Sequence, residues 1–274
     1  TNLLDAAVDG SFVLTNSSRL YVYAAMTNDL TTNYGARVRA LGDMSVGGGS
    51  WVYPVSAPQN GGSVYFAAGC LTVTDASSGF DANRIGYEGG RGIGTGPWPA
   101  PGGWYGGGGY GGKGGGSGNP LADNGGPTYG LSNAPARCGS GGGYSGGGAG
   151  GGLIWVRVDD RIMLNGTMRA NGGDGAGGGG AGAGSGGGIY LVCPRLSGVN
   201  GVLTANGGNN SVFSGAGGGG RIAVIRYPGR QTADLGTWTI TASGGTGGGA
   251  GYHGATGTVY IGEMLIQGTI FAVH

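Results

Sequence analysis

The chain has 274 residues, of which 75 are glycine, 14 are basic and 13 are acidic, giving a formal net charge of +1. This balance excludes a polybasic nucleic-acid surface, and the 10 prolines without a strict Gly-X-Y register exclude collagen. Long helices are excluded because each interior glycine costs a helix about 1 kcal/mol relative to alanine, and no apolar run reaches the roughly 20 residues of a membrane helix. The 24 aromatic residues argue against disorder.

The first 85 residues are predicted to form a β region. Runs of apolar, β-branched and aromatic residues are typical of strands, and the Asn, Ser and Asp clusters between them are typical of turns. These runs lie at residues 11–14, 20–25, 36–41, 51–55, 63–68 and 70–74.

Residues 86–152 form a glycine-rich region that contains 31 glycines. Extended chains without Cβ atoms can approach closely, and several three-residue-per-turn helices can then exchange hydrogen bonds as a polyglycine II array. We expect ordered arms of this kind; mobile loops at the rim are the alternative.

Residues 153–274 contain a β repeat that alternates with glycine runs. Ala170, Ala205 and Ala242 mark equivalent points of three copies, with spacings of 35 and 37 residues. Short strands are predicted at 153–158, 189–192, 221–225 and 258–261. Units this small must stack to bury their apolar faces. We therefore predict an all-β fold of stacked parallel β-solenoid or sandwich-like repeats, with glycine-rich arms and essentially no α-helix.

The repeat motif is carried by residues 164–174 with 187–192, and by residues 199–209 with 218–224. This motif is similar to the glycine-rich repeat regions of large secreted bacterial surface proteins, which implies an extracellular location. The glycine arms also resemble, in composition, phage adhesin tips and the glycine-rich domain of the anaplastic lymphoma kinase receptor. That resemblance implies packed polyglycine II helices and partner binding. A chain that begins at Thr1 fits a mature secreted product or a trimmed one.

No motif points to a catalytic, cofactor or metal site. Residues 107–113 have the spacing of a phosphate-binding loop, but Gly114 stands where Ser or Thr would bind the metal. Neither His253 nor His274 belongs to a recognisable triad. We expect no enzyme activity, no cofactor and no metal.

Several polar residues favour structural roles over chemical ones. The pair Asp159 and Asp160 predicts a turn, and Asp174 and Asn209, at matched repeat positions, favour turns over a cation site. The three cysteines have no C-x-x-C spacing, so one disulfide with a free thiol and three buried thiols both remain open. They are Cys70, Cys138 and Cys193.

Aromatic residues gather in one segment of the glycine-rich region and form a candidate site for a glycan or receptor. Their rings can stack on sugars or on a partner chain, or they can cover bare glycine backbone. They are Trp98, Trp104, Tyr105 and Tyr110. Candidate glycosylation sites with the sequence N-x-[ST] are Asn16, Asn165 and Asn209.

The favoured function is that of a secreted, non-enzymatic structural protein that assembles with itself into a surface filament or sheath. Apolar strands near both ends are expected to pair with a second copy through their edges. The candidate assembly residues are Phe12, Val13, Leu14, Leu265, Ile266, Ile270 and Phe271. The alternative is an adhesin or fibre-tip module that binds a surface glycan or receptor; nucleic acid and membrane insertion are not expected.

Overall fold

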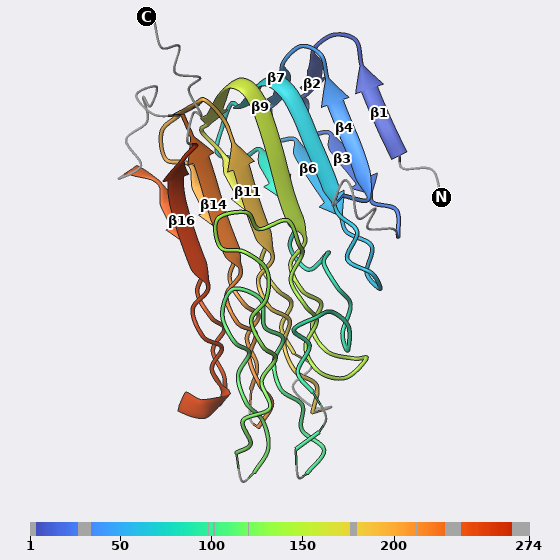
Figure 1. Ribbon diagram of the computed structural model, residues 1–274, viewed down its shortest axis with the longest axis vertical. Helices are drawn as coiled ribbons and strands as arrows, with labels where there is room; N and C mark the ends of the chain where they lie inside the picture. The colour runs from blue at the N-terminus through green and yellow to red at the C-terminus, as the bar shows by residue number, and fades with distance from the viewer. Residues whose placement is uncertain are drawn as a thin grey trace, which may run out of the picture.

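The computed structural model describes residues 4–26, 34–97, 99–100, 102–119, 121–175, 180–211, 213–227 and 237–264. Candidate residues Trp98, Leu265, Ile266, Ile270 and Phe271 lie outside these ranges. The described strands form a ten-stranded sheet, called here the long sheet, and a six-stranded sheet, called the short sheet. All pairings between these strands are parallel (Figure 1).

The main path of the long sheet runs in the order β1, β4, β7, β9, β11, β14, β16, and β2, β5 and β12 extend it around a bend. Its strands are β1 (Leu4–Val8), β2 (Phe12–Leu14), β4 (Ala36–Ala40), β5 (Met44–Val46), β7 (Val64–Val73), β9 (Leu153–Leu164), β11 (Gly188–Val192), β12 (Arg195–Ser197), β14 (Arg221–Arg226) and β16 (Thr258–Glu263). The short sheet has the order β15 (Thr239–Thr241), β13 (Val202–Thr204), β10 (Thr167–Arg169), β8 (Gly79–Asp81), β6 (Trp51–Val55), β3 (Arg19–Tyr23). A short 3-10 helix spans Ala250–Tyr252, and the described residues contain no α-helix.

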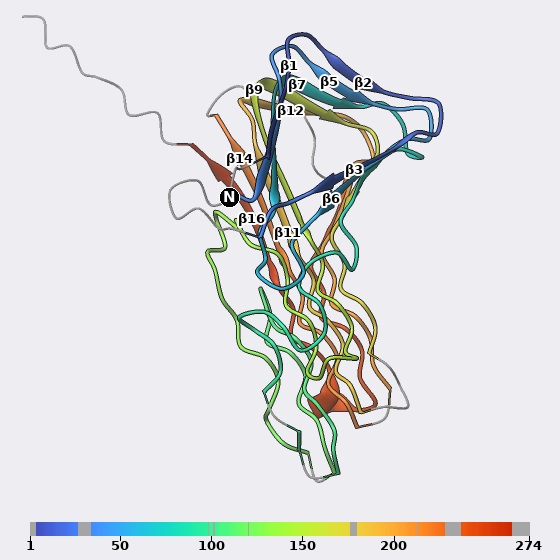
Figure 2. The same cartoon turned by 90° about the vertical axis from the view of Figure 1, so that its right-hand side faces the viewer.

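The strands follow one another as the coils of a solenoid. The side view shows the chain crossing from the long sheet, over the face that contains β2, β5 and β12, toward the short sheet (Figure 2). The strands β7 and β9 are long enough to run around the bend themselves, and their pairing register shifts there, between Ala68 and Cys70. The predicted stacked parallel β architecture is confirmed.

The core lies between the two sheets and consists of inward-facing apolar side chains from successive coils. Phe66 of the long sheet and Phe80 of the short sheet meet edge to face at 5.5 Å, and both are fully buried. Because alternate residues of a strand point to opposite faces, the neighbours of such core residues lie on the outer faces of the sheets.

Two parts of the predicted strand pattern need correction. Asp159 and Asp160 do not form a turn, because β9 continues through both. The bend that the charged pair suggested is made inside the strand, where the register of β7 against β9 shifts. The strands β1, β5, β8 and β12 lie outside the runs and the repeat copies predicted from the sequence, and β5, β8 and β12 have only three residues each.

The described parts of the glycine arms are ordered, and their hydrogen bonds repeat every three residues. In residues 182–187, the amides of Gly182 and Ser185 donate to one neighbouring segment, at residues 143 and 140. The next amides, at 183 and 186, donate to residues 215 and 218, and those at 184 and 187 donate to residues 173 and 170. A chain whose amides turn to three neighbours in succession is a polyglycine II helix, which has three residues per turn and no internal hydrogen bonds.

The glycine-rich region 86–152 is part of the same array. In residues 215–220, amides 215 and 218 donate to residues 105 and 108 of that region, whereas amides 217 and 220 donate to residues 208 and 205, in the outgoing half of the same arm. The arms extend together away from the sheets (Figure 1). The insertion between β8 and β9 therefore supplies chains that the arms need as hydrogen-bonding partners.

An asparagine ladder marks the point where the short sheet passes into the arms. The side-chain oxygen of Asn83 accepts the amide of Asn171 at 2.7 Å, that of Asn171 accepts the amide of Asn206 at 2.7 Å, and that of Asn206 accepts the amide of Ser243 at 2.8 Å. The preceding alanines, including Ala82, are buried. Residues 79–83 are thus a further copy of the repeat, which the glycine-rich insertion separates from the others.

We predict that Gly217→Ala destabilises the protein whereas Gly10→Ala does not. A Cβ atom on Gly217 would lie 1.9 Å from the carbonyl oxygen of Gly184, so packed backbones would have to separate. A Cβ atom on Gly10 meets nothing within 4 Å. Urea unfolding should show a loss of about 1–3 kcal/mol for Gly217→Ala, as for other overpacked sites, and equal stability of the two variants would contradict the close packing of the arms.

Candidate functional site

Four aromatic side chains form a row on the outer face of the long sheet. Tyr65, Trp155 and Tyr190 occupy one register of β7, β9 and β11, so their side chains leave the sheet on the same side. The ring centroids of Tyr65 and Trp155 are 4.9 Å apart, those of Trp155 and Tyr190 are 5.9 Å apart, and Tyr34 stacks on Tyr65 at 5.3 Å. All four side chains are half-buried. We call Tyr34, Tyr65, Trp155 and Tyr190 the aromatic row.

A groove with a volume of about 330 Å³ adjoins the aromatic row at Tyr65. Small residues of β7 form its floor, and longer polar side chains of β4 and β9 stand on its two sides. Its lining includes Arg37, Arg39, Tyr65, Ala67, Arg157 and Asp159. We call this feature the arginine groove.

The charges around the arginine groove are unevenly paired. Arg37 forms an ion pair with Asp5, and this hydrogen bond is the main reason why the pKa of Asp5 lies below its ordinary value. Burial raises the pKa of Tyr65, while Arg157 opposes that rise and Asp159 adds to it. Burial raises the pKa of Tyr190 as well, so both phenols remain neutral hydrogen-bonding groups at neutral pH.

The arginine groove lies on one side of the aromatic row, and on the opposite side part of the glycine-rich region covers the long sheet. The Nε of Arg221 donates to the carbonyl of Tyr129 at 2.9 Å, and its guanidinium lies 5.5 Å from the ring of Tyr110. Leu153 is completely buried with Tyr87 and Cys138. This cover borders the aromatic row and leaves the arginine groove open.

The described members of the predicted aromatic binding site lie in different surroundings. Tyr110 is completely buried and contacts the ring of Tyr129 at 4.7 Å, so a ligand at the surface cannot reach it. Trp104 packs edge to face on Phe213 at 5.5 Å. Burial therefore excludes Tyr110 from a site at the surface, whereas the role of Trp104 stays a prediction.

Tyr105 lies in a different place, beside Tyr144. Their rings are 5.2 Å apart and line a shallow hollow of about 470 Å³ together with Arg91 and residues of the glycine arms. Tyr144 is 51% exposed. This hollow is a second aromatic surface, with two rings where the aromatic row has four.

Two of the three candidate glycosylation residues hold neighbouring coils together. The side-chain oxygen of Asn165 accepts the amide of Val199 at 2.9 Å, and that of Asn209 accepts the amide of Thr246 at 2.8 Å. Asp174 in turn accepts the amide of Asn209 at 2.8 Å. These contacts stack one repeat on the next, whereas Asn16 is exposed in a turn with a φ of 60°.

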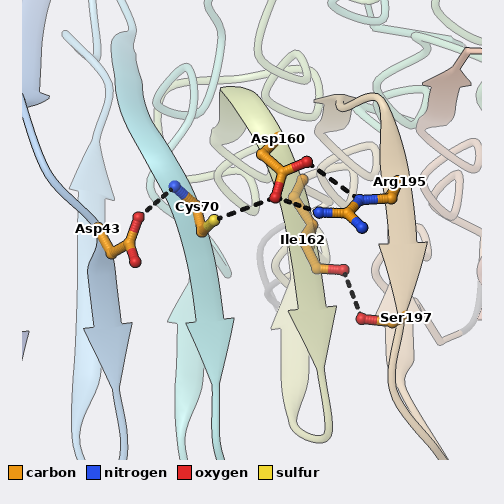
Figure 3. Close-up of polar contacts among 6 residues, drawn as sticks. All are labelled: Asp43, Cys70, Asp160, Ile162, Arg195 and Ser197. Carbon is orange, nitrogen blue, oxygen red and sulfur yellow. Dashed lines mark hydrogen bonds and ion pairs between the residues drawn. The ribbon is translucent and has the colours of Figure 1, made fainter.

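A polar cluster at the bend combines a thiol with two carboxylates (Figure 3). Asp43 accepts the amide of Cys70 at 2.9 Å, and the thiol of Cys70 points to Asp160 at 3.8 Å. Arg195 donates to the same carboxylate through Nε and Nη2, and Ser197 donates to the carbonyl of Ile162 at 3.4 Å. The cluster ties strands of neighbouring coils together.

The thiol of Cys70 lacks the features of an activated nucleophile. Burial raises its pKa, and the Arg195 guanidinium lowers the pKa of Asp160, which makes that carboxylate a weaker base. His253 lies elsewhere, where its Nδ1 accepts the amide of Gly247 at 2.8 Å. In the part of the chain that is described, no group of three His, Cys, Asp or Glu residues is placed to hold a metal ion.

Comparison with family models, with curated proteins and with solved structures gives no match for this chain. No helix within the described ranges has the length and hydropathy needed to cross a membrane.

The aromatic row and the arginine groove were not predicted from the sequence. Tyr65, Trp155 and Tyr190 lie far apart in the chain and meet only because their strands share a register. A signal was present, however: each ring comes three residues after a glycine, at Gly62, Gly152 and Gly187.

All three cysteines are free thiols, and we predict that they differ in how fast an alkylating reagent modifies them. Burial raises the pKa of Cys138 to about 11 and that of Cys193 to about 12, so both stay protonated and protected at neutral pH. Iodoacetamide should modify only Cys70 in the folded protein, and slowly, whereas concentrated guanidinium chloride should expose all three. Peptide mass spectrometry reads both results, and a disulfide-linked peptide pair would contradict the structure.

Proposed function

We propose that this chain is a non-enzymatic binding module of an extracellular surface, and that the aromatic row recognises a glycan. The observation that supports the proposal is the continuous row of four rings on the outer face of the long sheet. Aromatic rings give an apolar face to the C–H groups of a sugar and leave hydroxyl groups at the edge free for hydrogen bonds.

The rigidity of the platform favours binding. Tyr65, Trp155 and Tyr190 stand on paired strands whose inner faces belong to the core, so a ligand would not have to order them. A binding surface that is already ordered avoids an entropy cost of about 0.5–1.5 kcal/mol per immobilised side chain. Because the row crosses several neighbouring strands, it is also suited to an extended ligand. A single loop would offer too short a surface for such a ligand.

We predict that Trp155→Ala weakens glycan binding about tenfold or more, because aromatic anchors of this kind supply most of the binding energy. Trp51→Ala is the matched control, since Trp51 is also half-buried but stands in β6 of the short sheet. Binding is measured on an array of neutral and acidic oligosaccharides, and circular dichroism checks the fold.

Tyr65→Leu, which keeps an apolar side chain but removes the ring, provides a second test. If both row variants bind as the wild type does, or if Trp51→Ala causes the same loss, the aromatic row is not the glycan-binding surface. A wild-type protein that binds no glycan on the array would refute the proposed function as a whole.

Self-assembly is a second candidate function, supported by the free edges of the outermost strands. Within the described residues, β1, β2 and β3 pair on one side only, and so do β15 and β16. Val13 is 64% exposed, while Phe12 and Leu14 pack against the core. Unpaired edges of parallel strands can accept a further strand from a second copy.

We predict that Ala6→Lys blocks such stacking, whereas Ala7→Lys does not. Ala6 pairs with Val38, whose side chain is in the core, and Ala7 pairs with Arg39 on the outer face. Only the first lysine would place a charge over the open end of the core. Light scattering over a range of concentrations should show assembly for wild type and Ala7→Lys and its loss for Ala6→Lys; a monomeric wild type at all concentrations would refute self-assembly.

A further inference from the structure

We propose that the arginine groove binds an acidic group, a carboxylate or a sulfate, of a polysaccharide that lies across the long sheet. This inference rests on the proposed function and names its ligand class, an anionic rather than a neutral glycan.

The geometry of three neighbouring strands creates the site. Arg39 of β4, Ala67 of β7 and Arg157 of β9 share one register. Because neighbouring strands are about 4.8 Å apart, the Cα atoms of the two arginines are separated by roughly 10 Å. Ala67 carries only a methyl group between them, so two long cationic side chains border a low floor.

Both guanidinium groups are available to a ligand. Arg39 and Arg157 are exposed, and neither forms a salt bridge with any described carboxylate, whereas Arg37 is engaged by Asp5. Among the described residues, the acidic groups at the groove are Asp159, two residues along β9 from Arg157, and Asp5, which pairs with Arg37 and also interacts with Arg39. Three arginines against these two carboxylates leave the described groove positive.

The chemistry of the two arginines matches an oxyanion. The guanidinium fork donates two parallel hydrogen bonds to a carboxylate or sulfate, and such charge-assisted bonds are roughly twice as strong as neutral ones. One acidic group placed between Arg39 and Arg157 would accept hydrogen bonds from both guanidinium groups. Asp159 would repel an acid placed beside it, which directs the ligand toward Arg39 and the centre of the groove.

A sugar polymer fits this surface better than a nucleic acid does. Tyr65 lines the groove and also belongs to the aromatic row, so a sugar ring can stack there while its acidic substituent reaches the arginines. Nucleic-acid binding depends on many phosphate contacts. This groove offers two free arginines on a chain with a net charge of +1.

The test compares the full chain with a double variant, Arg39→Ala with Arg157→Ala. Titration calorimetry measures binding to polygalacturonate, which carries carboxylates, and to dextran sulfate, with neutral dextran as reference. The double variant should bind both anionic polymers about tenfold more weakly or worse, because each fork loses hydrogen bonds to a charged group. Rising salt should weaken the wild type more than the double variant.

Arg19→Ala is the matched control, because Arg19 is an exposed arginine of β3 without a salt bridge to any described residue. It should leave binding unchanged. Equal affinity of wild type and double variant for both anionic polymers would overturn the inference, and so would tighter binding of wild type to duplex DNA than to either polymer.

The outcome also separates the two proposals. If neutral dextran or neutral oligosaccharides bind through Trp155 but independently of Arg39 and Arg157, the proposed function holds and the anionic ligand class is wrong. If the anionic polymers bind through the two arginines and Trp155→Ala weakens that binding, both proposals are supported.

Discussion

The structure depends on the pairing of backbone amides in segments that have no side chains to bury. A buried amide without a partner is costly, and a chain of glycines can find partners only in other chains that come equally close. In residues 182–187 the successive amides therefore reach three different segments. No arm can be ordered alone, and the region 86–152 is required because it supplies neighbours that the repeat does not contain.

Two sources of stability are thus joined in one chain. In the solenoid, apolar side chains such as Phe66 and Phe80 bury hydrophobic surface between two sheets. In the arms, hydrogen bonds replace that burial, and glycine is required because a Cβ atom on Gly186 would lie 2.1 Å from the carbonyl oxygen of Ala205. The asparagine ladder lies at the junction between the sheets and the arms, and its hydrogen bonds hold successive arms in the same register as the strands that precede them.

The stacked β architecture could be predicted from the sequence repeats. The aromatic residues that share one face of the long sheet could not. Ala170, Ala205 and Ala242 recur at nearly constant spacing, and stacking followed from that. The copy at residues 79–83 was missed because the insertion separates it from the others. The glycines on either side of Tyr110 leave open from the sequence whether its ring is exposed or covered, and in the structure they let other chains cover it completely. The aromatic row depends on strand register, which short-range patterns do not contain.

The threefold hydrogen-bond pattern of the arms also restricts how such a protein can change its length. Removing one residue from an arm would turn every following amide by a third of a turn, toward the wrong neighbour. Removing three residues restores each direction and shortens the arm by about 9 Å, three steps of the 3.1 Å rise. Within the hydrogen-bonded stretches, changes in whole turns therefore keep every amide directed to its neighbour. The arm between Arg169 and Gly188 is two residues longer than the arm between the paired positions Thr204 and Arg221, so other changes of length are tolerated outside those stretches.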